Sequence, residues 1–219
     1  MTSKNLVIET EVTGTEDGKE TYCISRTWNK EKKKALVIEL YPTITVKNTM
    51  CLDKSTVALL NHAEELGWGS IKIVNLYSTV FVSKPLVAQL KESEDNLKHI
   101  AEILGQSDIT KYDIVIAWGS SLSTHKVTNE LKRKVLNLLM ERGLFAQVKH
   151  IVTEMLMTND GVATHPLYLL LRHNFEKWFL HPYPIESELK KFNKLCGKES
   201  EEVKENSKSK NTKRRSKAQ

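Results

Sequence analysis

Three short apolar runs, each close to a segment of helical periodicity, constrain the fold of this chain more than any other feature. The runs are ALVIEL at 35–40, SIKIVNL at 70–76 and DIVIAW at 113–118. Their length and composition are typical of strands that are buried on both faces of a sheet. Apolar residues at helical spacing recur at 55–66, 94–104 and 125–142, and a glycine follows each segment.

Strands that alternate with helices of this length predict an α/β fold. We expect a three-layer α/β/α sandwich, in which helices cover both faces of a mainly parallel central sheet. A further helix is expected at 85–91 and a fourth strand at 145–152. The predicted organisation is a polar N-terminal segment at 1–20, a single α/β domain at 21–195 and a basic tail at 196–219.

The tail accounts for the basic character of the chain. Its residues are mainly Lys, Glu, Ser and Asn, which bury too little apolar surface to offset their ordering entropy, so we expect disorder. The net charge is +6, and residues 206–219 carry six basic and no acidic residues, so residues 1–205 are neutral. This tail either attracts DNA phosphates or only solubilises the chain. The six basic residues are Lys208, Lys210, Lys213, Arg214, Arg215 and Lys217.

Composition and missing motifs narrow the functional class. The sequence has no apolar run long enough to span a membrane and no signal-peptide pattern at its start. Its three cysteines are widely spaced and include no C-x-x-C pair, which argues against disulfides and structural zinc. The common nucleotide, dinucleotide, hydrolase and zinc-protease signatures are missing. We therefore expect a cytoplasmic protein without membrane contact, metal or cofactor.

Polar and aromatic residues follow the apolar strands at the point where each strand ends. They are Tyr41-Pro42-Thr43, Asn75 with Tyr77, and Trp118-Gly119. Ligands of parallel α/β sheets bind at the carboxyl ends of the strands, so we expect these residues to converge on one edge. The amide of Asn75 offers an acceptor and donors that match the edge of a base. Its alternative role is that of a turn former or strand-end cap.

Other residues join this candidate site with alternatives of their own. His165 could bind a phosphate or stabilise an anion, or it could be an ordinary loop histidine. Tyr41, Trp118 and Tyr168 could stack on a base or simply pack in the fold. Asp53 could cap the helix that follows, and that helix N-terminus could receive a phosphate. Arg26 is either an anion contact or a packed residue of an edge strand.

Six short motifs occur in the order of a bacterial and phage family, domain of unknown function 1643. The chain resembles this family over about residues 22–184, and the family implies no settled activity. The motifs are Arg26-x-Trp28, Leu40-Tyr41-Pro42-Thr43, Gly67-Trp68-Gly69, Val74-Asn75-Leu76, Ala117-Trp118-Gly119 and His165-Pro166-Leu167-Tyr168.

The same residues more distantly resemble the uracil-DNA glycosylase superfamily. That resemblance implies a parallel sheet between helices, with Asn75 reading a base and His165, before Pro166, stabilising the departing base. Trp118-Gly119 matches a turn at the end of a later strand. The chain departs from the pattern at Tyr41, where glycosylases commonly place a water-activating carboxylate or amide. Tyrosine is a poor general base at neutral pH, and the nearby carboxyls of Glu39 and Asp53 are candidates only if they point into the site.

Two functions of different classes follow from these observations. In the first, the protein recognises a nucleobase or nucleotide and also cleaves an N-glycosidic bond in modified DNA or in a nucleotide. In that hypothesis Asn75 reads the base, Tyr41 or Tyr77 stacks on it, and His165 stabilises the leaving base. The alternative is a non-catalytic module that holds a nucleotide or DNA, for example in phage–host conflict. The sequence also permits an interaction protein without a working site.

Overall fold

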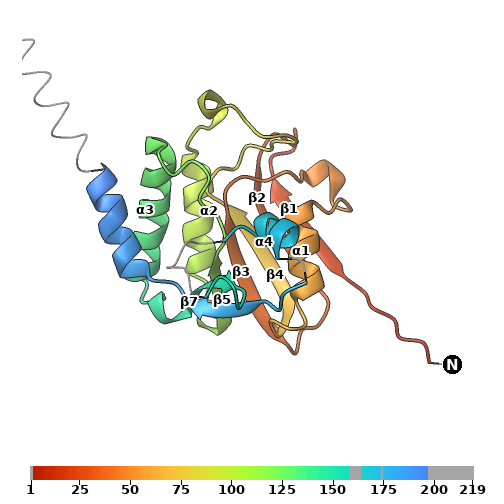
Figure 1. Ribbon diagram of the computed structural model, residues 1–219. Coiled ribbons are helices and arrows are strands. Elements are labelled where there is room, and N and C mark those ends of the chain that lie inside the picture. Colours follow the sequence, from red (N-terminus) through yellow and green to blue (C-terminus); the bar gives the residue numbers. More distant parts are fainter. Residues whose placement is uncertain (1, 158–163, 174, 197–219) are drawn as a thin grey trace, which may run out of the picture.

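A computed structural model describes residues 2–157, 164–173 and 175–196 (Figure 1). Its strands form one seven-stranded sheet in the order β1-β2-β4-β3-β5-β6-β7. The α/β class is thereby confirmed. The strands are β1 Glu9–Gly14, β2 Thr21–Thr27, β3 Lys33–Glu39, β4 Trp68–Asn75, β5 Tyr112–Ile116, β6 Val148–Val152 and β7 Phe179–Pro182.

The sheet is mixed rather than mainly parallel, which corrects the sequence-based expectation. The inner strands β4, β3, β5 and β6 are parallel to one another, whereas β1–β2, β2–β4 and β6–β7 are antiparallel pairs. β1 and β2 are joined by a short turn around Gly18, and strands joined in this way must be antiparallel. β1 also adds a strand from within the polar residues 1–20.

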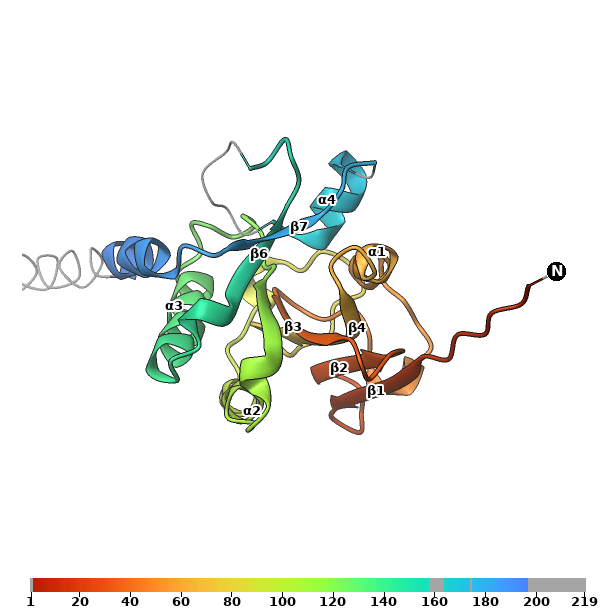
Figure 2. The ribbon, with the colours of Figure 1, turned by 90° about the horizontal axis from the view of Figure 1, so that it is seen from below.

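Helices cover both faces of the sheet (Figure 2). α1 (Lys54–His62) and α4 (Pro166–Arg172) lie on one face, and α2 (Glu94–Leu104) and α3 (Lys126–Glu141) lie on the other. Each inner strand divides its side chains between the two faces. In β3, Ala35 and Val37 belong to the core under α1 and α4, whereas Leu36 and Ile38 belong to the core under α2 and α3.

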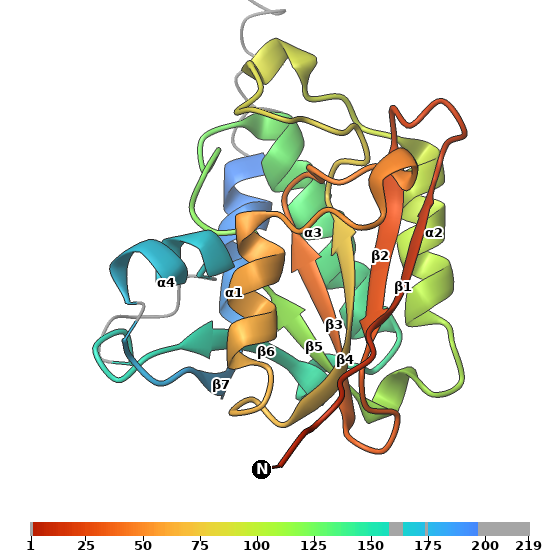
Figure 3. The same cartoon turned by 90° about the vertical axis from the view of Figure 1, so that its right-hand side faces the viewer.

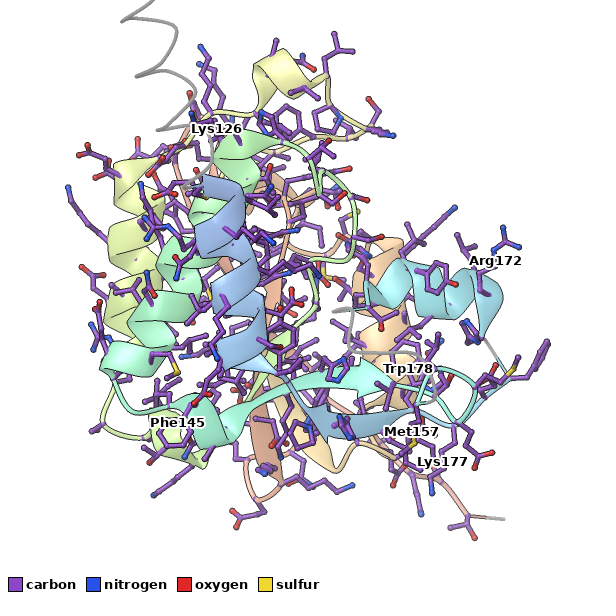
Figure 4. The ribbon with its side chains drawn as sticks, turned by 60° about the vertical axis from the view of Figure 1, so that its left-hand side comes forward. Lys126, Phe145, Met157, Arg172, Lys177 and Trp178 are labelled. Carbon is purple, nitrogen blue, oxygen red and sulfur yellow. The ribbon has the colours of Figure 1, made fainter. Side chains whose placement is uncertain are left out.

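A helical segment at 185–196 lies beside α3, whose first residue, Lys126, is labelled in Figure 4. Ile185 and Phe192 of this segment join the core under α3. The helix expected at 85–91 is only a short 3-10 turn, Val87–Gln89. Leu86 and Val87 are exposed there and only Leu90 reaches the core, so a longer helix would gain little from packing.

A buried ion-pair network ties the four inner strands together at their amino ends. The carboxylate of Asp113 in β5 is 2% exposed and lies 2.7 Å from Lys33 Nζ of β3 and 2.6 Å from Lys149 Nζ of β6. Trp68 Nε1 of β4 donates to its other oxygen at 3.1 Å. This edge of the sheet is therefore occupied by a structural network, and the carboxyl edge is the one left for a ligand.

Cys23, Cys51 and Cys196 form no disulfide. Within the part of the chain that the structure describes, no helix has the length and apolar character needed to cross a bilayer.

Candidate functional site

The carboxyl ends of β3, β4 and β5 lie at one edge of the sheet, as expected for neighbouring parallel strands. Strand alternation then divides the residues at this edge between the two faces. Glu39 and Asn75 point to the face covered by α1 and α4, which lie side by side in front of the sheet in Figure 3. We call Glu39, Asp53, Asn75 and His165 the carboxyl-edge cluster.

Glu39 and Asn75 form the centre of the cluster. They are direct partners in the register between β3 and β4, and their side chains are 5% and 2% exposed. Among the described residues, Glu39 Oε1 and Asn75 Oδ1 are buried without a hydrogen-bond partner. Burial, reinforced by the negative charge of Asp53, raises the pKa of Glu39 to about 8. Other buried polar atoms, among them Asn96 Oδ1 and Trp178 Nε1, are also unpaired. The pair of Glu39 and Asn75 differs from them by lying at the carboxyl ends of parallel strands, where such sheets bind ligands, so it is suited to a ligand.

Asp53 connects the centre of the cluster to α1. It is the N-cap of that helix, and its Oδ1 accepts from the backbone N–H of Thr56 at 2.7 Å. Its Oδ2 accepts from the hydroxyl of Thr43. The predicted capping role is therefore present. The carboxylate also acts electrostatically on both Glu39 and His165, which places Asp53 near both of them.

His165 enters the cluster from α4, where it is the N-cap. Its Nδ1 accepts from the backbone N–H of Leu167 at 3.2 Å. Burial lowers the pKa of His165, although the negative charge of Asp53 opposes this shift. The ring is therefore neutral at neutral pH, and because Nδ1 is an acceptor its proton resides on Nε2. The side chain thus offers one N–H donor to a ligand.

Gly119 sets the position of His165. It has a φ of +67°, a left-handed conformation that favours glycine. A Cβ added at Gly119 would lie 3.0 Å from His165 Cβ, closer than nearly all real contacts of this kind. The turn after β5 therefore approaches His165 in a way that only glycine allows.

We expect Gly119→Ala to displace His165 while leaving the fold intact. The left-handed φ destabilises the alanine variant by about 1 kcal/mol, and the new Cβ pushes the imidazole away from the cluster. The His165 ring resonances in NMR spectra should shift, and those of His181 on β7 should not. Gly143→Ala is a matched control, since Gly143 has a φ of +68° and open space around the added Cβ. Unchanged His165 resonances would contradict the steric argument.

The predicted aromatic residues lie away from this cluster. Trp118 packs in the core under α3, where Lys132 Nζ lies 5.7 Å from the ring centroid of the indole. Tyr77 is buried in the same core, and its hydroxyl hydrogen-bonds Thr128 at 2.7 Å. Tyr41 contacts Phe81 edge-on, and the half-exposed Tyr168 lies against His173. These aromatic rings therefore do not converge with Asn75. Trp118 and Tyr77 lie beyond the ends of their strands, and their side chains belong to the core on the opposite face of the sheet.

The remaining predicted residues support the loops around the cluster. The carbonyl of Pro42 accepts from the backbone N–H of Phe81 at 2.9 Å. Arg26 is 4% exposed and donates to the hydroxyl of Thr10 at 2.9 Å and to the carbonyl of Cys51 at 2.7 Å. Arg26 thus anchors the loop that precedes α1, a packed role rather than an open anion contact.

One residue of this region, Asn96, was missed by the sequence analysis, and another, Glu39, was a candidate only if it pointed into the site. Glu39 is a charged residue inside an otherwise apolar run, and it does lie on the face of Asn75. Asn96 of α2 is fully buried and donates to the carbonyls of Asn75 at 2.9 Å and Leu76 at 3.1 Å. It fixes the backbone at the end of β4. Its sequence context is that of an ordinary first helical turn, and only the fold reveals this contact.

A cleft of about 290 Å³ lies elsewhere, between β1, β2 and β4 and the helix α2. Its lining includes both acidic and basic side chains, among them Glu11, Lys72 and His99. The predicted site residues do not line it. The described residues contain no group of three His, Cys, Asp or Glu side chains that could hold a metal ion.

Comparison with known families identifies one match, to the family described as protein of unknown function DUF1643, over residues 21–167. No curated protein and no solved structure gives a significant match. The matched residues include every member of the carboxyl-edge cluster and confirm the resemblance seen in the six motifs. Because the match extends over well more than half of the sequence, the chain belongs to the DUF1643 family.

Proposed function

We propose that this protein recognises a nucleobase or nucleotide at the carboxyl-edge cluster. The observation that carries the proposal is the buried, unpartnered Oδ1 of Asn75, which lies beside Glu39 at the end of a parallel strand. An amide in this position reads a donor–acceptor edge such as that of a base. His165 adds an Nε2–H donor from α4, suited to an oxygen or developing anion on the ligand.

We further propose that the fold is glycosylase-like, with a distant relation to the uracil-DNA glycosylases. Four parallel strands at the centre of the sheet and helices on both faces support this relation. Polar groups rather than stacked aromatic rings carry recognition in this proposal, because Trp118 and Tyr77 are buried in the other core. We propose a cytoplasmic location, in keeping with three cysteines that form no disulfide.

The test is retention of nucleotides by the wild-type protein and by an Asn75 variant. Each protein is dialysed against a mixture of the common ribo- and deoxyribonucleoside 5′-monophosphates, and bound species are identified by mass spectrometry. We expect Asn75→Ala to weaken retention about 10-fold or more, the loss for a buried hydrogen-bonding group. Asn61→Ala is the matched control, because Asn61 is an exposed residue of α1. Equal retention by wild type and Asn75→Ala would contradict the proposal.

A second candidate function is non-catalytic holding of a nucleotide or of DNA, and Tyr41 favours it because it replaces the expected carboxylate. Contact with DNA through the basic tail is part of this candidate, and the tail lies outside the described residues. The salt dependence of DNA binding with and without residues 206–219 tests that contact. Loss of binding on truncation would assign it to the tail.

A further inference from the structure

Glu39 is a buried carboxyl group beside the proposed base-reading residue, and it lacks a basic partner. Among the described residues it forms no hydrogen bond or ion pair that would hold a negative charge, and 5% of it is exposed. Ionising such a group is strongly unfavourable, so it retains its proton. Its raised pKa of about 8 agrees with this argument. At neutral pH the cluster therefore contains an O–H donor.

We propose that Glu39 is the general acid of an N-glycosidic cleavage and that it protonates the departing base. This inference rests on the proposed function and extends it from recognition to bond breaking. As the bond between the sugar C1′ and the base nitrogen breaks, its electron pair goes to the base and the Glu39 proton moves to a ring nitrogen. A water molecule adds to C1′, and the proton that this water releases returns to the Glu39 carboxylate.

The charged groups around Glu39 affect its pKa. Asp53 of α1 contributes the charge that raises the Glu39 pKa, and its own two oxygens are oriented by Thr56 and Thr43. The groups near Asp53 on this face are the neutral His165 of α4 and Arg26 of β2, which is engaged by backbone carbonyls. His62 of α1 and Glu65 lie on the same face and pair with each other. Burial is the main cause of the raised Glu39 pKa, and the charge of Asp53 raises it further.

The experiment measures retained nucleotide and released free base for the full-length wild type, Glu39→Gln and Asp53→Asn. The probes are the mononucleotide mixture above and single-stranded oligonucleotides containing uracil, hypoxanthine or a methylated base. We expect the wild type to release a base at a rate that falls above about pH 8, as Glu39 loses its proton. Glu39→Gln should retain the probe but release base at least 100-fold more slowly, the usual contribution of a general acid.

Asp53→Asn tests the role of Glu39 through the pH dependence of base release. A purely structural role of Glu39 would leave that pH dependence unchanged. Asparagine also caps helices well, so α1 should persist. Removing the negative charge lowers the Glu39 pKa, so the alkaline decline in base release should move to lower pH. An unmoved decline would overturn the assignment of Glu39.

The remaining outcomes separate this inference from the proposed function. Retention without base release by the wild type at any pH would overturn the general-acid role and leave recognition standing. Release that Glu39→Gln does not slow would also overturn it. Neither retention nor release of any probe would overturn the proposed function and the inference with it.

Discussion

Replacing Asp113 by alanine should lower the free energy of unfolding by about 3 kcal/mol, because its buried carboxylate accepts hydrogen bonds from two partly exposed ammonium groups and one buried indole. The change leaves the ammonium groups of Lys33 and Lys149 and the indole N–H of Trp68 without their shared acceptor. For a domain of this size the melting temperature should fall by roughly 10 °C. Thermal and urea unfolding followed by circular dichroism measure both quantities.

The pair between Lys34 and Asp108 is the matched control. It also joins a lysine of β3 to an aspartate, at 2.9 Å, but its carboxylate is 38% exposed, whereas that of Asp113 is 2% exposed. Asp108→Ala should therefore cost less than about 1 kcal/mol. An equal, small loss in both variants would show that the buried network at the amino edge adds no special stability.

The pH dependence of the Asp113 contribution has a definite sign. Burial alone would raise the pKa of Asp113, but hydrogen bonds from Lys149, Lys33 and Trp68 outweigh it and the pKa is lowered. Stability from such a group is present above the pKa of the unfolded chain, about 4, and is lost as pH falls through the folded value. The difference between wild type and Asp113→Asn should therefore shrink as the solution becomes more acidic than pH 4.

Replacing Glu39 by glutamine should stabilise the protein progressively as pH rises. The folded state raises the Glu39 pKa from 4.5 to about 8, so between these values the unfolded chain releases a proton that the folded chain retains. Stability of the wild type is therefore intact below about pH 4.5 and declines by about 1.4 kcal/mol per pH unit up to the folded pKa. From pH 5 to pH 8, Glu39→Gln should gain about 4 kcal/mol relative to wild type.

Urea unfolding at several pH values measures this gain. Glu31→Gln is the control, because Glu31 lies exposed in the turn before β3, and its difference from wild type should remain flat. A flat difference for Glu39→Gln as well would mean that the carboxyl ionises freely in the fold. The same gain also ensures that a loss of base release in this variant does not arise from unfolding.

Local signals explain which elements could be predicted from the sequence. α2 occupies residues 94–104 as expected, because Ser93 caps its first turn and Gly105 follows its last residue. The inner strands were recognisable because both of their faces are apolar. β1 was not recognisable, since only one of its faces is partly buried. The positions on its exposed face carry Glu9, Glu11 and Thr13. The strand directions at the two ends of the sheet likewise depend on connections that periodicity does not encode.

For the candidate site, the sequence indicated the correct edge of the sheet but not the face. Asn75 and Glu39 share a face because they are register partners, and register arises only when the strands pair. Trp118 follows Ala117, and the alternation along β5 therefore directs its ring into the opposite core. His165 reaches the cluster through the close approach of Gly119, a tertiary contact between segments remote in sequence.

The central position of β3 has a consequence for how the chain is made. β3 lies between β4 and β5, and both of these neighbours come later in the sequence. Residues Ala35 to Ile38, which are fully buried in the fold, leave the ribosome before either neighbour exists. The edge that pairs with β4 stays open until Asn75 has been synthesised, and the edge that pairs with β5 stays open until Ile116. Open strand edges of this kind make a nascent chain prone to aggregation. Translation speed between β3 and β5 should therefore govern the yield of folded protein.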